Sequence, residues 1–515
     1  MRATTLILLA LAAACTPSST PDPLARRTTL GPEKLSSLDV TVGFEPGGAG
    51  CVTLVNGQLP APEIPGDYCP DGPGDVDNPL PYQTGRRVRV FLNVDAIGTR
   101  GTYQFPVTGS IGLSMNVGTI QSGTPSYLQG GRVQRQKVVF QNAPGKVQLW
   151  AEAGTLLTLP DGTDQSPTFT LGASSPLWFG QPTLPDVQRA DNDLTSPLQG
   201  QRVEVQAHNL MVTRIAGNGF TVQDLGVPLV DGLPKWNGLF VFAFNGVDSI
   251  TVGTRLLKLK GAITAFQGMT QLGEPEFVAV GGECAPRQEP SRYGREPTES
   301  EEGGSLIRAR CPANAECVDD RCVPKNDPYE YDRLGRTVCH QVTTCGGATA
   351  ECPAGTQCVD REDWRTVDAL GQPAFTCQAC PAVVGGELWT TPGQTPGWCG
   401  PLWTGDSHPE LKMRNEMLEG ALLQLQDAVV DGLDLNDDFF RSGFYSFGQW
   451  KLKLPNGACA TVSSEVAPDF DVVGANANRT RLSSFTGTLR QVRFTKGSAY
   501  WMIDLRHKGD LVVAP

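Results

Sequence analysis

The residues best suited to hold a metal ion are a pair of cysteines and two histidines. Zinc takes four ligands in a tetrahedron, and Cys377-Gln-Ala-Cys380 supplies two of them, with His340 or His408 as further candidates. In an exported chain with an even set of cysteines, disulfide bonds account for the same residues. We therefore expect disulfides here, and neither a metal nor another cofactor.

Carboxylates are concentrated in Asp431-Gly-Leu-Asp-Leu-Asn-Asp-Asp438, between two expected strands. Calcium requires six or more oxygen ligands from a flexible loop. The run lacks the glycine at the sixth place and the distal glutamate of an EF-hand loop. A solvated acidic turn is the favoured interpretation, with calcium binding as the alternative.

Residues for catalysis are scarce. The chain has 4 histidines, and none lies in an HExxH, a GxSxG or a phosphate-binding-loop context. Any two aspartates can still meet in space to act as acid and base. A hydrolase of unrecognised type is therefore the weakest hypothesis, and we expect no enzymatic activity and no catalytic residues.

Aromatic residues form two groups, one in the middle of the chain and one between residues 439 and 450. The first group alternates along an expected strand, so its rings share one face. Rings on such a face can stack on the units of an oligomer, although aromatic residues at period two pack in a core more often. The predicted ligand contacts are Phe240, Phe242, Phe244, Phe444, Tyr445 and Trp450.

Composition favours short strands and turns over long helices. The chain has 515 residues with 59 glycines and 40 prolines, enough for about three or four domains. The net charge of -12 argues against a nucleic acid bound over a broad surface. Between Thr195 and Glu283 acidic residues outnumber basic ones by one, whereas a single-strand binder needs a surplus of cations.

The N-terminus has the features of an export signal. One positive charge precedes an apolar run that is too short to span a bilayer permanently. Ala12 to Ala14, directly before Cys15, resemble a bacterial lipobox, which implies a signal peptide over 1–15 and a lipidated Cys15; ordinary signal cleavage is the alternative. Residues 16–36 are polar and rich in proline, as in a disordered tether. Because Thr16 is not the aspartate of inner-membrane retention, the resemblance implies the outer membrane.

The remaining cysteines form an even set. Of 15 cysteines, 14 are left once Cys15 is assigned to the anchor. Cys51 and Cys69 are isolated from the others and most simply pair with each other, and Cys284 with Cys459 is a hypothesis for a bridge across the cysteine-rich region. The disulfide candidates are Cys51, Cys69, Cys284, Cys311, Cys317, Cys322, Cys339, Cys345, Cys352, Cys358, Cys377, Cys380, Cys399 and Cys459.

Residues 37–180 alternate between apolar and polar with period two, for example in Val88-Arg-Val-Phe-Leu-Asn-Val. About seven short strands separated by glycine-containing turns predict a β-sandwich. The run from Val139 to Gly154 resembles the late strands of bacterial immunoglobulin-like domains, which implies an immunoglobulin-like sandwich.

A pattern in the middle of the chain is repeated near its end. Gly-x-x-apolar-x-apolar-Gln opens at 200–206 and again at 420–426, and Arg-Leu-x-x-apolar-x-Gly-x-apolar closes at 255–263 and again at 481–489. Each copy resembles the OB-fold modules that accompany bacterial extracellular nucleases. The resemblance implies one OB-like barrel over 195–283 and a second over 410–515.

The segments between the two copies complete an all-β, multidomain architecture. Residues 284–304 are an acidic linker without apolar periodicity. Residues 305–400 hold ten cysteines and too few apolar residues for a core, so disulfides must stabilise this module. The one stretch expected to be helical is His408 to Leu418.

Together these patterns predict a non-enzymatic lipoprotein of the cell envelope that acts as a surface binding, adhesion or scaffold protein. Its expected partners are the membrane, through the lipid anchor, and a protein or glycan at the cell surface; the charge balance disfavours nucleic acid. The alternative is an accessory protein that binds an oligonucleotide or oligosaccharide beside a secreted hydrolase.

Overall fold

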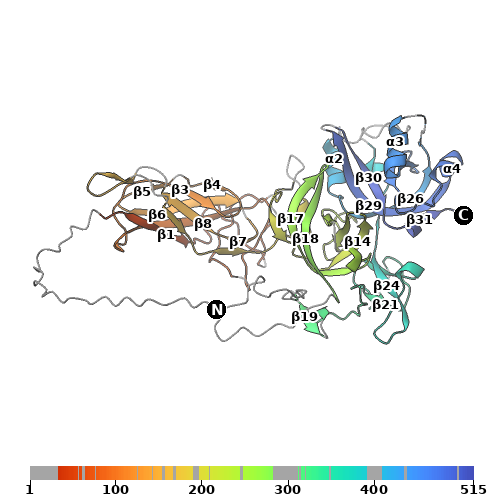
Figure 1. Ribbon diagram of the computed structural model, residues 1–515, viewed down its shortest axis with the longest axis horizontal. Coiled ribbons are helices and arrows are strands. Elements are labelled where there is room, and N and C mark those ends of the chain that lie inside the picture. Colours follow the sequence, from red (N-terminus) through yellow and green to blue (C-terminus); the bar gives the residue numbers. More distant parts are fainter. Residues whose placement is uncertain are drawn as a thin grey trace, which may run out of the picture. The chain divides into compact units, whose positions relative to one another are not determined.

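The computed structural model is mostly β (Figure 1). It describes residues 33–55, 57–60, 64–75, 77–124, 126–141, 143–153, 157–165, 170–189, 196–207, 209–243, 247–281, 311, 315–318, 321–346, 350–390, 409–433, 436, 438–495 and 498–515. Within these residues no helix has the length and apolar character needed to cross a bilayer. The predicted signal peptide, Cys15, the tether up to residue 32 and the acidic linker lie outside the described residues.

The chain divides into two compact units. Unit 1 contains the residues up to Glu45, Arg89–Phe140 and Gln148–Pro176. Unit 2 contains Pro46–Val88, Gln141–Val147 and Leu177–Pro515. Two segments inside the expected sandwich range, 46–88 and 141–147, therefore belong to unit 2.

Unit 1 is the predicted β-sandwich. Its strands form two four-stranded sheets, in the orders β1-β2-β6-β4 and β11-β8-β3-β5. Alternate side chains of β2, from Val88 to Val94, are fully buried, as the period-two pattern predicts. The strands are β1 (Leu35–Gly43), β2 (Arg87–Gly98), β3 (Gly109–Met115), β4 (Ile120–Ser122), β5 (Ser126–Leu128), β6 (Arg132–Gln141), β8 (Leu149–Ala153) and β11 (Thr170–Ala173), with β9 (Leu157–Thr158) and β10 (Asp164–Gln165) as a small hairpin.

Unit 2 begins with a loop closed by a disulfide and a short helix. Cys51 and Cys69 are bonded, which confirms the predicted pair. The capping box of α1 (Leu184–Gln188) explains where the helix starts, because Thr183 and Asp186 bond each other's backbone amides. Close by, β7 (Gly145–Val147) pairs with β12 (Leu177–Phe179).

The first repeat forms a closed five-stranded barrel, which we call barrel 1. Its strands follow the order β14-β15-β16-β18-β17, and β17 pairs again with β14 to close the ring. β16 and β18 run parallel and the other pairs antiparallel, and this gives the Greek-key connectivity of an OB-like barrel. The elements are β13 (Arg202–Glu204), β14 (Leu210–Ala216), β15 (Gly219–Asp224), β16 (Gly238–Phe242), η1 (Val247–Ser249), β17 (Arg255–Phe266) and β18 (Met269–Ala279).

The second repeat, barrel 2, has the same connectivity. Its ring is β26-β27-β28-β30-β29, with β28 and β30 parallel and β29 pairing back to β26. The elements are α2 (Pro409–Glu416), β26 (Leu422–Val430), α3 (Asp438–Phe447), β27 (Gln449–Lys453), β28 (Cys459–Ser463), α4 (Val472–Ala477), β29 (Arg481–Thr495), β30 (Ser498–Leu505), η4 (Lys508–Asp510) and β31 (Leu511–Val513).

The repeated motif occupies the same register in both barrels. Val203 pairs with Gly261 in barrel 1, and Leu423 pairs with Gly487 in barrel 2. At both glycines a Cβ would overlap a backbone oxygen of the neighbouring strand: that of Gly273, 2.6 Å away, for Gly261, and that of Asp504, 2.0 Å away, for Gly487. The motif glycines thus permit the close approach of this backbone.

The cysteine-rich module between the barrels has little regular structure and is held by disulfides. Its described bonds are Cys311–Cys322, Cys339–Cys358, Cys345–Cys380 and Cys352–Cys377. Cys317 and Cys459 are also disulfide-bonded, whereas Cys284 and Cys399 lie outside the described residues, so the hypothesis of a Cys284–Cys459 bridge stays a prediction. The elements are β19 (Ala315–Val318), β20 (Arg321–Pro324), β21 (Val338–Cys339), β22 (Thr356–Val359), η2 (Glu362–Trp364), β23 (Thr366–Val367), β24 (Pro373–Ala379), β25 (Ala382–Val383) and η3 (Gly386–Leu388).

Ion pairs attach this module to both barrels. Arg255 of β17 lies 2.9 Å from Asp327, and both side chains are nearly buried. On the other side Arg361 lies 3.2 Å from Asp510 of barrel 2, and its guanidinium stacks over the ring of Trp364 at 3.8 Å. The module is therefore packed against the barrels and is not a free-standing domain.

The helix prediction was right for one element and incomplete for the rest. The stretch His408–Leu418 contains α2, but α1, α3 and α4 were not predicted. In α3, Phe440, Phe444 and Phe447 follow the spacing i, i+4, i+7 that is typical of a helix. The sequence analysis assigned no element to this second aromatic group, and the structure places Phe444 and Tyr445 on α3.

Candidate functional site

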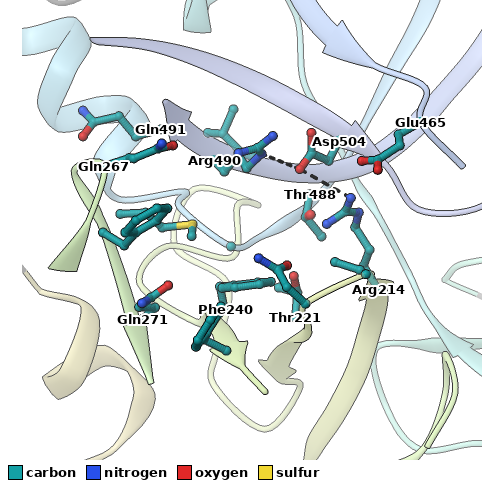
Figure 2. Close-up of a pocket in the computed structure, with 18 residues that line it drawn as sticks. Arg214, Thr221, Phe240, Gln267, Gln271, Glu465, Thr488, Arg490, Gln491 and Asp504 are labelled. Carbon is teal, nitrogen blue, oxygen red and sulfur yellow. Dashed lines mark ion pairs between the residues drawn. The ribbon is translucent and has the colours of Figure 1, made fainter. Parts of the chain in front are cut away.

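A cleft of about 380 Å³ lies where barrel 1 faces barrel 2 (Figure 2). Barrel 1 contributes the β14–β15 turn, the outer faces of β15 and β16, and the β17–β18 turn. Barrel 2 contributes β29, β30 and the segment after β28. The lining residues are Arg214, Ala216, Gly217, Asn218, Thr221, Phe240, Phe242, Phe266, Gln267, Met269, Gln271, Gly420, Glu465, Thr488, Leu489, Arg490, Gln491 and Asp504.

The phenylalanine side chains of β16 face this cleft because their neighbours fill the barrel. Leu239 and Val241 are fully buried in the core of barrel 1. Since side chains alternate along a strand, Phe240 and Phe242 point outward and are only partly buried. The core interpretation of these two rings, which the sequence favoured, is therefore wrong.

The β17–β18 turn of barrel 1 extends the wall. Phe266, in the strand end before the β17–β18 turn, is 55% exposed and adds a third ring. At the adjoining Gly268, which has a φ of +90°, a Cβ would lie 1.7 Å from Oε1 of Gln491 in barrel 2. A glycine is needed there because the turn touches the other barrel.

Polar groups between the rings are mostly amides and hydroxyls. The amides come from both barrels, with Asn218, Gln267 and Gln271 on one side and Gln491 on the other. Each of these amide side chains offers an NH₂ group that donates hydrogen bonds and an oxygen that accepts them. The Nε2 group of Gln491 is buried without a hydrogen-bond partner among the described residues, so the cleft has polar capacity that the protein itself does not use.

An ion cluster forms the base of the cleft and joins the two barrels. Asp504 of β30 lies 3.4 Å from Arg214 of barrel 1 and 2.5 Å from Arg490 of β29 (Figure 2). Arg214 also donates from Nε to the carbonyl oxygen of Leu505, at 3.2 Å. Burial lowers the pKa of the Arg214 guanidinium, and the neighbouring Asp504 carboxylate opposes that shift.

The charges of the cleft cancel. Two arginines face the carboxylates of Asp504 and Glu465, and Glu465 is exposed at the edge. The Oδ1 atom of Asp504 is buried without a hydrogen-bond partner in the described part of the chain. Of the residues that line the cleft, none is a histidine or a cysteine, so the arrangement is suited to binding by stacking and hydrogen bonds.

The predicted ligand contacts are not all brought together. Phe240 and Phe242 line the cleft, and Phe244 lies outside the described residues. Trp450 is buried in the core of barrel 2, where it packs against Phe485 with ring centroids 5.8 Å apart and its indole Nε1 donates to Ser464. Phe444 and Tyr445 lie on α3, beside a second hollow.

Sequence reasoning missed the ion cluster and the third ring. Arg214 and Asp504 are separated by almost the whole length of the repeat region, so no local spacing signals their contact. Phe266 carries a weak sequence signal, because it ends an expected strand directly before Gln267-Gly268, where the glycine favours a turn. Rings at loop ends of an OB-like barrel are candidates for ligand contact.

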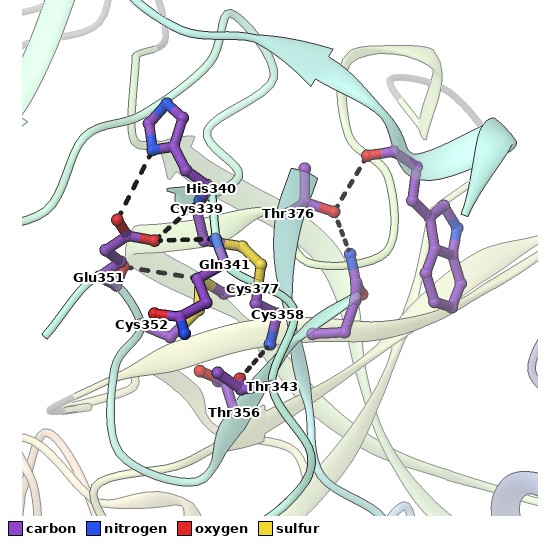
Figure 3. Close-up of a disulfide and its surroundings, with 12 residues drawn as sticks. Cys339, His340, Gln341, Thr343, Glu351, Cys352, Thr356, Cys358, Thr376 and Cys377 are labelled. Carbon is purple, nitrogen blue, oxygen red and sulfur yellow. Dashed lines mark hydrogen bonds and ion pairs between the residues drawn. A yellow bond between two sulfur atoms is a disulfide. The ribbon is translucent and has the colours of Figure 1, made fainter. Parts of the chain in front are cut away.

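The cysteines considered for zinc are oxidised. Cys377 is bonded to Cys352 and Cys380 to Cys345, and the buried bonds Cys339–Cys358 and Cys352–Cys377 lie close together (Figure 3). His340 faces the carboxylate of Glu351, with Nδ1 3.7 Å from Oε1. The disulfide prediction is confirmed, and sulfur atoms in these bonds are not thiolate ligands for zinc.

The acidic run at 431–438 is only partly described. Asp431 pairs with Arg479, Oδ2 to Nη2, at 2.8 Å, so at least one of its carboxylates already has a protein partner. Asp434 and Asp437 lie outside the described residues, and calcium binding stays a hypothesis.

With the fold and the cleft established, we compared the chain with known proteins. No protein-family model, no curated protein and no solved structure matches it.

Proposed function

We propose that this protein is a non-enzymatic binding protein that holds an uncharged oligosaccharide in the cleft between its two barrels. The observation that carries the proposal is a combination of two features of the cleft. Three outward-facing phenylalanine rings lie beside amide and hydroxyl side chains, and the ion cluster below them has charges that cancel. Rings can cover the apolar face of a sugar, and amides can bond its hydroxyl groups.

The position of the cleft supports the same class of ligand. OB-like barrels bind oligonucleotides and oligosaccharides on the face of their second and third strands and the adjoining loops. In barrel 1 these elements are β15, β16 and the β14–β15 and β17–β18 turns, which line the cleft.

Charge favours the sugar over the nucleic acid. Binding to a phosphate backbone requires unpaired cations and gives affinity that falls steeply with salt. Here Arg214 and Arg490 share the carboxylate of Asp504, and the chain as a whole carries a net charge of -12.

The cell envelope is the proposed place of action. Disulfides persist in oxidising compartments, and five are described in this chain. This supports export, and with it the lipid anchor at Cys15 and a role in surface binding, adhesion or scaffolding.

The test is calorimetric titration of the whole chain with cello-, chito-, malto- and xylohexaose and, separately, with an oligothymidine. We expect affinity for at least one sugar that changes little with salt. Phe266→Ala should weaken it roughly tenfold, because it removes one stacking contact. The matched control is Tyr127→Ala in the sandwich, at 62% exposure against 55% for Phe266.

Binding of oligothymidine with a steep salt dependence, or equal loss of affinity in both variants, would overturn the proposal. Lipid attachment is tested separately by palmitate labelling, which should disappear in Cys15→Ala.

A further inference from the structure

A second hollow, also of about 380 Å³, lies on barrel 2 between α3 and the segment that connects β28 to α4. Four of its twelve lining residues are aromatic: Phe444, Tyr445 and Phe447 come from α3 and Phe470 from the connecting segment. Neither element belongs to the strand face that an OB-like barrel commonly uses for binding.

The floor of this hollow is held firmly by the barrel. Phe470 packs against Trp450 with ring centroids 5.7 Å apart, and Trp450 donates to Ser464 at 2.9 Å. The C-terminal end of α3 is fixed by the amide of Gly448, which donates to the carbonyl of Phe444 at 2.9 Å. Phe470 and the C-terminal end of α3 are therefore anchored to the barrel, as a preformed site requires.

The outer rings are unusually open for an amphipathic helix. Phe444 packs toward the core of barrel 2, whereas Tyr445 is 70% and Phe447 50% exposed. Single exposed aromatics are common, but here two adjoin a hollow that contains further rings.

Two residues belong to both hollows. Glu465 and Arg490 line the cleft between the barrels and also the hollow beside α3. Figure 2 shows Glu465 at one end of the cleft and Arg490 nearer its middle, reaching toward Asp504. The side chain of Arg490 is 32% exposed, and within the described residues its one ion pair, to Asp504, uses Nε. Its charge is balanced by Asp504, while its terminal nitrogens can still donate hydrogen bonds to the hydroxyl groups of an uncharged ligand that passes from one hollow to the other.

We propose that the hollow beside α3 is a second subsite for the same oligosaccharide, whose chain runs from the rings of β16 past Arg490 and Glu465 to Tyr445. This inference rests on the proposed function. Each hollow alone is near the lower limit of ligand sites, roughly 300–1,000 Å³, and the two together fit a longer chain. The alternation of rings, a charged pair and further rings matches a ligand with repeated apolar faces and polar edges.

The test compares a disaccharide with a hexasaccharide of the same linkage, chosen from the series that binds in the panel above. Tyr445→Ala should weaken hexasaccharide binding roughly tenfold, the loss of one stacked unit, and leave disaccharide binding unchanged. Phe266→Ala should weaken both, and Tyr127→Ala neither. Thermal unfolding of each variant checks that the fold is kept.

The outcomes separate the two proposals. If Phe266→Ala weakens both sugars while Tyr445→Ala changes neither, the second subsite is refuted and the cleft stands. If Tyr445→Ala weakens the binding of the disaccharide and of the hexasaccharide equally, the sugar chain does not extend from the cleft toward Tyr445, and the second subsite is refuted. If no oligosaccharide binds the wild-type chain, the proposed function fails, and the second subsite fails with it.

Discussion

The two barrels share strand order, register and motif glycines, yet they meet at different faces. Barrel 1 faces the cleft with β15 and β16, whereas barrel 2 faces it with β29 and β30. The strands β14 and β15 of barrel 1 are joined by a tight turn at Gly217 and Asn218, but barrel 2 has α3 at the equivalent place, between β26 and β27. An insertion between the same two strands thus gives barrel 2 aromatic rings at a place where barrel 1 has only a tight turn.

The comparison shows that the repeated pattern determines how each barrel closes and leaves its outer surface open to change. Inside each barrel the residues are densely packed, so that a methyl group added at a motif glycine would overlap a neighbouring atom. The residues that face the cleft differ accordingly: phenylalanines on the third strand of barrel 1, at Phe240 and Phe242, and Arg490 on the fourth strand of barrel 2. Binding properties therefore lie in side chains placed on a common fold.

The largest expected effect tests the contact between the barrels. Asp504→Asn leaves two arginines without their shared carboxylate, and the side chain of Arg214 is only 8% exposed. Removing one partner of a buried ion pair costs about 3–5 kcal/mol, measured by urea unfolding. The matched control is Asp427→Asn, because Asp427 pairs with Arg481 at 3.1 Å with both side chains more than half exposed; it should change stability by less than about 1 kcal/mol. Equal effects of the two variants would contradict the role of the cluster.

The next effect tests whether the motif glycines are equivalent. Gly487→Ala and Gly261→Ala both place a methyl group against backbone oxygens inside a barrel, so each should lower the free energy of unfolding by about 2–3 kcal/mol. The loss should be greater at Gly487, where the overlap is closer. Gly217→Ala meets no atom within 4 Å and is the control. A small effect at one motif glycine alone would show that the two positions are not equivalent.

The smallest effect concerns a carboxylic acid buried between the barrels. Burial, and then the neighbouring Glu416 carboxyl, raise the pKa of Glu419 well above its usual value. A raised pKa in the folded state means that stability is highest at low pH and is lost as the pH rises above the unfolded value of 4.5. Glu419→Gln should therefore stabilise the protein on the order of 1 kcal/mol at pH 8 and hardly at all at pH 4.

Thermal unfolding of Glu419→Gln across this pH range gives the measurement. The control is Glu274→Gln, because the carboxylate of Glu274 is 84% exposed and should show almost no dependence. A stabilisation of Glu419→Gln that stays constant with pH would contradict the assigned protonation.

The sequence was informative wherever a pattern is local. Period-two alternation predicts the strands of the sandwich because a half-buried strand must alternate its side chains. The repeated Gly-x-x-apolar motif predicts two matched barrels, and isolation along the chain predicts the Cys51–Cys69 bond. In the cysteine-rich module the presence of disulfides was predictable, but their pairing was not, since many connectivities fit the same spacing.

The site was decided by contacts between residues far apart in the chain. Phe240 looks the same in sequence whether it faces a core or a cleft, and only the burial of Leu239 and Val241 settles the direction. Arg214 reaches Asp504 because two barrels pack together, and no spacing along the chain encodes that meeting. Local alternation and repeated glycines determine each β module by themselves, whereas the cleft exists only because packing brings an outer face of one barrel against the other.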